Sequence, residues 1–549
     1  MKKLIIISLA IILSTSALQA QVNSEVEVTK SYVPIVVKAQ KPMLEASIID
    51  TAYINPEISY SIIPVSIDTQ LQTTPIDPAT VTYWQFNRPS IAQLKVGAGY
   101  PLNSLLHGYI SSHNASVGYI AANIDHRGHY SNVENIYGDK VNALQLLNSG
   151  TIAGGVYLAD RTLEGDVSYT NNTFANYAFE YPDAKNINYQ NIAASIKYGD
   201  NFIDLSNYNF SVEAGGALFS DYLSNSEATI QIGALLGKSF DVGNIILGAN
   251  FKMIDDGDYY SNQTIAFSAM LEKIVSNWQL SAGLLYNMDN SDISSTPNHY
   301  FIPKIAIKHA LSRSISPFVE TGGRVTQNNF SHLLQLNPYV KEGSVAQSSV
   351  EYNLAAGLQG QLFSSMFAYK LSAGYKMAQN SLFWGLCVIN DDDDHYSYFD
   401  LDQDQLDTIS FNFDMNFKPT NTLSIDFDAH YYLYNEYQST SYVNSQPNFE
   451  ATLGAEYRVR NLGVGAKAHF IGERNYSILI YSTPDSNSPT ATTTTPPSVV
   501  DFSLYADWCA SDTFSFFIEG DNLLNEDLFP WPLYRGYGVT VTAGVKIIF

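Results

Sequence analysis

The sequence predicts an all-β fold, a transmembrane antiparallel β-barrel of about 22 strands, with an extended arm ahead of it and no full plug domain. Three observations support this prediction. Residues 409–433 alternate apolar and polar side chains, only 15% of the residues are charged, and residues 542–549 form an amphipathic strand that ends on an aromatic residue.

The clearest element is a hairpin whose two arms meet at 419–421. Apolar residues occupy every second position of both arms: Ile409, Phe411, Phe413, Met415 and Phe417, then Leu423, Ile425, Phe427, Ala429, Tyr431 and Leu433. Period-two alternation places these side chains on one face of a strand. Each arm has the roughly 9–11 residues that a strand needs to cross a bilayer. We therefore expect an apolar face toward lipid and a polar face toward a lumen.

The composition agrees with a lipid-facing wall. The chain has 38 Tyr and 28 Phe, which suits aromatic girdles at the two membrane interfaces, whereas soluble domains usually carry about 25% charged residues. Without Lys2 and Lys3 the chain keeps 27 basic and 53 acidic residues, a net charge of −26. Such a charge argues against a nucleic-acid partner, because phosphates require a basic face.

The first 89 residues contain two further segments. Residues 1–20 predict a signal peptide, with Lys2 and Lys3 before an apolar run and Ala20 at the expected cleavage site. Residues 21–89 contain prolines at 34, 42, 56, 64, 75, 78 and 89. Proline removes a ladder donor, so we expect an extended periplasmic arm there. The arm would either pack on its own barrel, where it could lie within the barrel mouth, or pair with the sheet edge of a partner.

Residues 90–549 are expected to form the barrel, with short turns and long loops in alternation. Short connections are predicted at 160–162, 239–243, 275–277, 312–314, 363–365, 460–461 and 510–512. Longer polar loops are predicted at 125–148, 174–187, 288–298, 325–347, 390–407, 436–446, 473–498 and 522–535. This alternation is typical of outer-membrane barrels, whose short turns are periplasmic. It yields about 21 strands, and a strand at 81–86 would give about 22, while about 14 to 18 longer strands remain an alternative.

The predicted loop at 390–407 is the best candidate for a metal site. It contains Asp391–Asp394 and then Asp400, Asp402, Asp404 and Asp407. Carboxylates at alternate positions can turn oxygens toward one calcium ion, although the glycine and the distal glutamate of a calcium loop are missing. The alternative is an acidic surface loop that attracts divalent ions diffusely near lipopolysaccharide.

The other polar groups in the sequence give no indication of a catalytic site. Asp414, Asp426, Asp428 and His430 share one face of the hairpin, as expected of a polar lumen, and His126, Arg127 and His129 suggest an interfacial cluster. We find no nucleophile elbow, phosphate-binding glycine loop or zinc spacing, so we expect no enzyme. Cys387 and Cys509 could pair in the periplasm, but one lies within a predicted strand and the other at a predicted turn.

The C-terminal region carries a family resemblance. Residues 519–525, Glu-Gly-Asp-Asn-Leu-Leu-Asn, resemble the element before the last strand of TonB-dependent receptor barrels. Residues 542–549 resemble the signal by which the outer-membrane assembly machinery recognises its clients. The arm is too short for a plug with its own core. Residues 26–34 and 123–130 look similar to a plug-less branch of these barrels, and residues 25–29 give only a weak TonB-box match.

The resemblance implies a location in the cell outer membrane, among lipid and lipopolysaccharide. The leading expectation is a scaffold or subunit of an envelope complex, such as one for outer-membrane protein assembly, with periplasmic or surface lipoprotein partners. The alternative is a transporter or channel for a small solute. An empty barrel of this size would leak, so we expect the arm, the long loops or a partner to occlude it.

Overall fold

The computed structural model describes residues 91–549, apart from 115–116, 136–137, 160, 178–185, 258–259, 364, 391–394, 437–441 and 482–488. The predicted signal peptide (1–20), the arm (21–89), the candidate strand at 81–86 and Asp391–Asp394 therefore lie outside the described residues.

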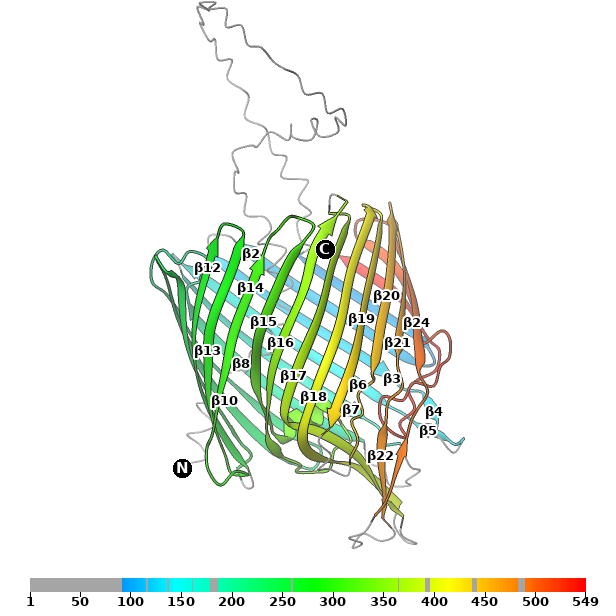
Figure 1. The fold of residues 1–549 in the computed structure, drawn as a ribbon. Helices are drawn as coiled ribbons and strands as arrows, with labels where there is room; N and C mark the ends of the chain where they lie inside the picture. Colours follow the sequence, from blue (N-terminus) through cyan, green and yellow to red (C-terminus); the bar gives the residue numbers. More distant parts are fainter. Residues whose placement is uncertain are drawn as a thin grey trace, which may run out of the picture. The chain divides into compact units, whose positions relative to one another are not determined.

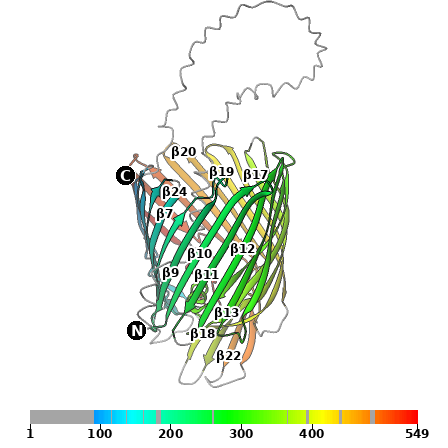
Figure 2. The same ribbon diagram turned by 90° about the vertical axis from the view of Figure 1, so that its left-hand side faces the viewer.

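One antiparallel sheet dominates the fold (Figures 1 and 2). It contains 24 strands, and 22 of them form the wall once the outlying hairpin β22–β23 is set aside. The wall strands are β1 (Ala92–Tyr100), β2 (Asn103–Asn114), β3 (Gly118–His129), β6 (Gln145–Leu158), β7 (Arg161–Phe174), β8 (Ile187–Gly199), β9 (Asn209–Asp221), β10 (Ser226–Phe240), β11 (Gly243–Asp255), β12 (Ser261–Val275), β13 (Trp278–Ser291), β14 (Asn298–His309), β15 (Ser316–Asn328), β16 (Ala346–Leu362), β17 (Phe367–Asn390), β18 (His395–Thr420), β19 (Leu423–Glu436), β20 (Phe449–Val459), β21 (Leu462–Ile471), β24 (Val499–Cys509), β25 (Phe514–Asp521) and β26 (Thr540–Ile548).

The wall closes because its first and last strands pair. β1 and β26 are antiparallel, with Val96 opposite Val545 and Gly97 opposite Gly544. Lys95 of β1 also forms an ion pair with Glu519 of β25. The barrel thus closes with 22 strands inside 92–548. The larger of the two predicted strand numbers is confirmed, and no strand at 81–86 is required.

The predicted hairpin is confirmed as β18–β19. Ile409 lies opposite Leu433 and Phe411 opposite Tyr431, and all four are exposed on the outer face. Because neighbouring residues of a strand point to opposite faces, Asn412 and Asp414 face the lumen. No helix in the described part of the chain is long and apolar enough to cross a membrane.

Most connections alternate in length, as predicted, although 200–208 at the short-turn end is longer than 222–225 at the long-loop end. Short turns join strands at one end, for example between β12 and β13 and between β20 and β21, and long loops join them at the other (Figure 1). In outer-membrane barrels the short turns are periplasmic, so the long-loop end faces the cell exterior.

The loop predicted at 390–407 is wrong for most of its length. β18 starts at His395, and its first residues pair with β17 from Ser381 to Asn390. The aspartates of this segment suggest a loop, but Phe399 and Leu401 alternate with Asp400 and Asp402. That alternation is itself the pattern of a strand.

Among the described residues of the long loops there are four short strands and one helix. β4 (Asn132–Glu134) pairs with β5 (Lys140–Asn142), and β22 (Tyr476–Tyr481) pairs with β23 (Thr490–Thr494). β22 also runs parallel to the outer end of β17, so β17, β18, β22 and β23 form a sheet that extends beyond the wall. The helix, α3, spans Phe330–Leu336.

A buried core fills the long-loop end of the barrel. It joins inward-facing wall residues such as Tyr189 and Phe219 to Phe330 and Leu333 of α3 and to Tyr534. We call the described residues of 130–144, 175–186, 329–345, 472–498 and 522–539, with the outer ends of β17 and β18, the cap. The cap places long loops at this end of the barrel, and occlusion of the lumen by them stays a prediction.

Candidate functional site

A cavity of about 680 Å³ lies between the cap and the inner face of the wall. This volume falls within the range of about 300–1,000 Å³ that is usual for small-molecule sites. Its polar and aromatic lining comprises Arg127, His129, Gln145, Phe174, Tyr177, Gln335, Tyr339, Arg474, Asp501, Asp521, Asn522, Phe529, Trp531, Tyr537 and Thr540.

Several wall strands supply one side of the cavity, among them β3, β24 and β25. Ile124 is exposed to lipid, so the alternation of β3 turns Arg127 and His129 toward the lumen. Asp501 of β24 and Asp521 of β25 face inward for the same reason. The ring of His129 stacks on Tyr537 with ring centroids 4.4 Å apart, and this contact joins the wall to the cap.

The segment 522–539 folds back over the cavity because Asn522 holds both of its ends. The Asn522 side-chain amide donates to the carbonyl oxygens of Glu526 (2.9 Å) and Tyr537 (3.0 Å), and its Oδ1 accepts from the Glu526 amide (2.9 Å). Asn522 adopts φ +48, a left-handed conformation that asparagine tolerates better than most residues. The Asn-Leu-Leu-Asn element noted in the sequence therefore anchors the cap.

Tyr534 is the centre of the cap and is fully buried. Its ring stacks on Tyr339 at 3.7 Å and meets Tyr177 edge-on at 5.0 Å. Its hydroxyl donates to Asn176 Oδ1 (2.6 Å), while the Tyr177 hydroxyl donates to the Arg535 carbonyl (2.8 Å). Three loops that are distant in sequence thus meet around one side chain.

The tyrosines of the cap remain neutral at physiological pH. Burial raises the pKa values of Tyr177, Tyr339, Tyr534 and Tyr537 above the ordinary value. Neutral hydroxyls can donate to carbonyl oxygens, as Tyr537 does to Ala143. The aromatic side of the cavity is therefore uncharged and combines ring faces with hydroxyl groups.

The positive charge of the cavity comes from Arg127 and Arg474. Neither forms an ion pair in the described part of the chain. The Arg474 guanidinium lies 5.7 Å from the centre of the Tyr476 ring, and its Nε is buried with no hydrogen-bond partner among the described residues. A guanidinium presents a planar set of donors that suits a carboxylate or another oxyanion.

The helix of the cap is fixed to the wall by Glu227. This carboxylate is 5% exposed at the outer end of β10. It accepts from the Ser331 amide at 3.0 Å and from the Asn329 side chain at 2.5 Å. A carboxylate at a helix N-terminus satisfies free backbone donors and interacts favourably with the helix dipole.

The four aspartates predicted to bind calcium are spread along β18. Asp400, Asp402 and Asp404 occupy alternate positions, and the Oδ1 atom of each accepts the amide of the next residue. Asp407 is buried and accepts from the Tyr375 hydroxyl at 2.7 Å. Among the described residues, no group of three or more His, Cys, Asp or Glu could hold a metal ion. Calcium binding by these residues stays a prediction.

The other polar groups singled out in the sequence are separated or lie in the lumen. His126 faces outward beside Ser104 and Asn148, whereas Arg127 and His129 line the cavity. Asp414, Asp426 and Asp428 line a groove in the lumen that also contains Lys308 and Lys370. Cys387 and Cys509 are both free.

Sequence reasoning did not identify the residues of the cavity. Tyr177, Tyr339, Arg474 and Trp531 lie in four different predicted loops, and their proximity is a consequence of the tertiary fold. Aromatic residues within otherwise polar loops were the signal that could have identified them.

Comparisons with known proteins place the fold. No family model and no curated protein matches the sequence. Among solved structures, the copper transporter OprC matches with a TM-score of 0.59 at 12% identity, over 83% of this chain and 80% of that chain.

Two further structures show the same architecture. The FrpB iron transporter from Neisseria meningitidis matches with a TM-score of 0.63 at 10% identity, over 85% of this chain and 82% of that one. The ferripyoverdine receptor of the outer membrane of Pseudomonas aeruginosa matches with a TM-score of 0.61 at 10% identity, over 84% and 72%.

The chain therefore has the 22-strand barrel fold of TonB-dependent outer-membrane receptors. Its closed wall and lipid-facing exterior place it in the cell outer membrane.

Proposed function

We propose that this protein is an outer-membrane receptor or transporter that takes up a small solute through the cavity under the cap. One observation carries the proposal: a closed barrel whose outer end is filled by loops that surround a cavity with the size and lining of a ligand site. The structural neighbours are named as transporters and receptors, which supports uptake as the function.

The lining indicates the class of ligand. Arg127 and Arg474 offer charge-assisted hydrogen bonds to an anionic group. Tyr177, Tyr339, Trp531 and Tyr537 offer ring faces and hydroxyls. A small anionic solute with an aromatic or other ring system matches both features, and Asp501 and Asp521 on the wall side can accept from its hydroxyl or amino groups.

The test is a binding titration on the intact protein in detergent, in which tryptophan fluorescence reports binding. The probes are salicylate, benzoate and glucuronate, and a Trp531→Phe variant assigns the signal. Arg474→Gln should weaken binding about tenfold or more, as expected for the loss of a hydrogen bond to a charged group. Arg460→Gln, in a short turn at the other end of the barrel, is the matched control. Equal affinities for the two variants, or no binding of any probe, would count against the proposal.

A second candidate is the predicted subunit of an envelope complex, and one observation favours it. The sheet formed by β17, β18, β22 and β23 extends beyond the wall, and β23 is exposed along its whole length. An exposed edge strand can pair with an extended segment of another protein. Purification in mild detergent from the native envelope tests this candidate, because a stoichiometric partner supports it and a solitary barrel argues against it.

A further inference from the structure

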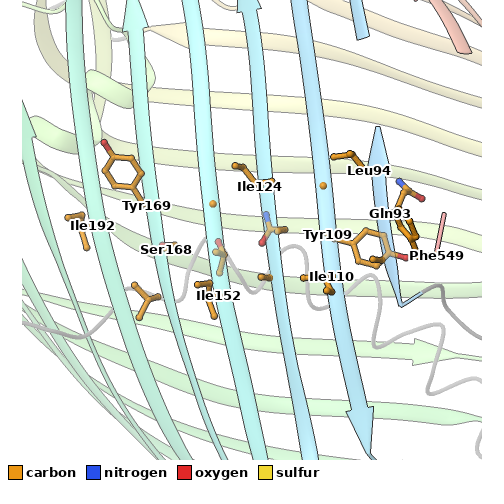
Figure 3. Close-up of a pocket in the computed structure, with 17 residues that line it drawn as sticks. Gln93, Leu94, Tyr109, Ile110, Ile124, Ile152, Ser168, Tyr169, Ile192 and Phe549 are labelled. Atoms are coloured by element: carbon orange, nitrogen blue, oxygen red, sulfur yellow. The ribbon is translucent and has the colours of Figure 1, made fainter. Parts of the chain in front are cut away.

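The outer face of the wall beside the β1–β26 seam carries an apolar groove of about 760 Å³. Gly108 and Gly150 leave space there, because they alternate across neighbouring strands with Leu94, Ile124 and Tyr169. Figure 3 shows Ile110, Ile124, Ile152 and Ile192 on this surface, on β2, β3, β6 and β8, and each residue is about half exposed or more. In the membrane such a groove is covered by hydrocarbon.

A row of polar side chains adjoins the groove on its cell-exterior side. His126 lies two residues beyond Ile124, so it faces outward like Ile124. Its ring nitrogens lie 2.7 Å from Ser104 Oγ and 2.6 Å from Asn148 Oδ1. The row continues to Gln190, which accepts from the Tyr169 hydroxyl at 3.2 Å and donates to Ser220 at 3.0 Å.

The chemistry of this row suits uncharged hydroxyl groups. Its members are amides, hydroxyls and one imidazole. Each of these groups can both donate and accept a hydrogen bond. The nearby cations point into the barrel: Arg127 lines the cavity and Lys95 pairs with Glu519. Phosphate recognition normally uses arginine or lysine, and neither residue lies in this outward row, so sugar hydroxyls fit it better than a phosphate does.

We propose that this surface binds one glycolipid of the outer leaflet. An acyl chain would lie in the groove over Gly108 and Gly150, and the sugar would contact Ser104, His126 and Asn148. The groove is apolar, the row is neutral and polar, and the two are adjacent at the membrane interface, which is the arrangement of an acyl chain and its sugar headgroup. This site is on the opposite side of the wall from the cavity and does not depend on the proposed uptake function.

Gly150 permits a test that keeps the fold. A Cβ at Gly150 would meet only the Asn123 carbonyl oxygen, at 3.4 Å, so the backbone there has room for a side chain and Gly150→Leu places it in the groove. Gly154 is the matched control because it lies on the same outward face of β6, a Cβ there has similar room (3.3 Å to the Tyr119 oxygen), and Gly154 does not line the groove.

The experiment measures lipid retention by native mass spectrometry. The full chain is placed in nanodiscs that contain monoglucosyl diacylglycerol and phosphatidylglycerol with identical acyl chains. The protein is then released from the nanodiscs in the mass spectrometer, and the lipids that stay bound are identified by mass. The intact protein and Gly154→Leu should retain one glucosyl lipid, whereas Gly150→Leu should retain about tenfold less, a loss comparable to two buried methylene groups. Ser104→Val combined with His126→Phe should keep a bound lipid but lose the preference for the glucosyl headgroup.

Two outcomes would overturn the proposal. One is equal retention by Gly150→Leu and Gly154→Leu. The other is equal retention of the two lipids by the intact protein. A photoactivatable acyl chain on the glucosyl lipid provides a check without any substitution, because its cross-links should map to residues 108–110, 122–124 and 150–152. Cross-links spread evenly around the barrel would contradict a defined site.

Discussion

The wall and the cap of this barrel are stabilised by different interactions. The wall is a continuous ladder of backbone hydrogen bonds, and its large apolar side chains remain exposed to lipid, as Ile152 does at 61%. The cap has little regular structure, and it is held by buried aromatic side chains around Tyr534. Regular pairing therefore satisfies the backbone where water is absent, whereas side-chain packing holds the loops where water is present.

The single strand β18 belongs to the wall in one half and to the cap in the other. Its residues from Thr408 onward face lipid on one side and the lumen on the other. Its residues before Asp407 leave the wall, pair with the outer end of β17 and pack Phe399 against Trp531 and Tyr534. The same period-two pattern thus forms a lipid-facing surface in one half of the strand. In the other half it contributes side chains to the buried core of the cap, outside the membrane.

The largest expected effect is on the cap. Tyr534→Ala should destabilise it by about 3–5 kcal/mol, the usual cost of removing a large buried aromatic side chain, and leave the wall intact. Hydrogen exchange of 329–345 should rise strongly, and planar-bilayer recordings should show new conductance. Tyr534→Phe, which keeps the ring but loses the hydroxyl that donates to Asn176, should cost about 1 kcal/mol. Unchanged exchange in Tyr534→Ala would show that the cap does not depend on this core.

The matching change in the wall is Phe411→Lys. A lysine facing lipid at mid-wall should cost about 2–4 kcal/mol, and it should lower the temperature at which the folded barrel unfolds on semi-native gels. Exchange within the cap should not change. Asn412→Lys, the inward-facing neighbour, is the control and should cost much less. If both lysines destabilised equally, the assignment of the two faces would be wrong.

A smaller effect is expected where the cap meets the wall. Glu227→Ala leaves the Ser331 amide and the Asn329 side chain without their acceptor, at a cost of about 1–3 kcal/mol. Hydrogen exchange of α3 should increase, while Glu227→Gln keeps one acceptor oxygen and should show about half of the change. Glu272→Ala, at an exposed position near the other end of the barrel, should have no effect on α3.

Acidification should loosen α3 modestly. Burial, with the positive charges of Lys252 and Arg324, lowers the pKa of His332 below its usual 6.5. The folded cap therefore binds fewer protons than the unfolded chain, and its stability falls as the pH drops below about 6.5 toward the lowered pKa. Hydrogen exchange of 330–336 at pH 7.5 and 5.5 measures this change. His332→Gln should remove the difference, and a persistent difference would assign it to another group.

The smallest effect concerns calcium. The carboxylates of Asp400, Asp402 and Asp404 are held at alternate positions of a strand, so we expect at most the weak affinity of extracellular calcium modules, about 10⁻⁴–10⁻³ M. Isothermal titration of the intact protein and of Asp400→Asn/Asp402→Asn measures it. Equal heats from both proteins would show that these residues bind no calcium.

The sequence by itself determined the wall. The alternation at 409–433, the short turns and the C-terminal amphipathic strand predicted a closed barrel and its lipid-facing side, because side-chain period and backbone pairing are local properties of a strand. Strand number could be estimated for the same reason. The acidic run at 400–407 is strand and not the predicted loop, because its apolar residues alternate with the aspartates although the segment is rich in charge.

Only the tertiary structure decided the cap and its cavity. Arg127, Tyr177, Tyr339, Arg474 and Trp531 are separated by up to about four hundred positions, and no local pattern relates them. They meet because closing the sheet brings every long loop to one rim, where aromatic residues escape water by packing together. A strand's environment is encoded along the strand, whereas a site built from loops depends on where the closed wall places their ends.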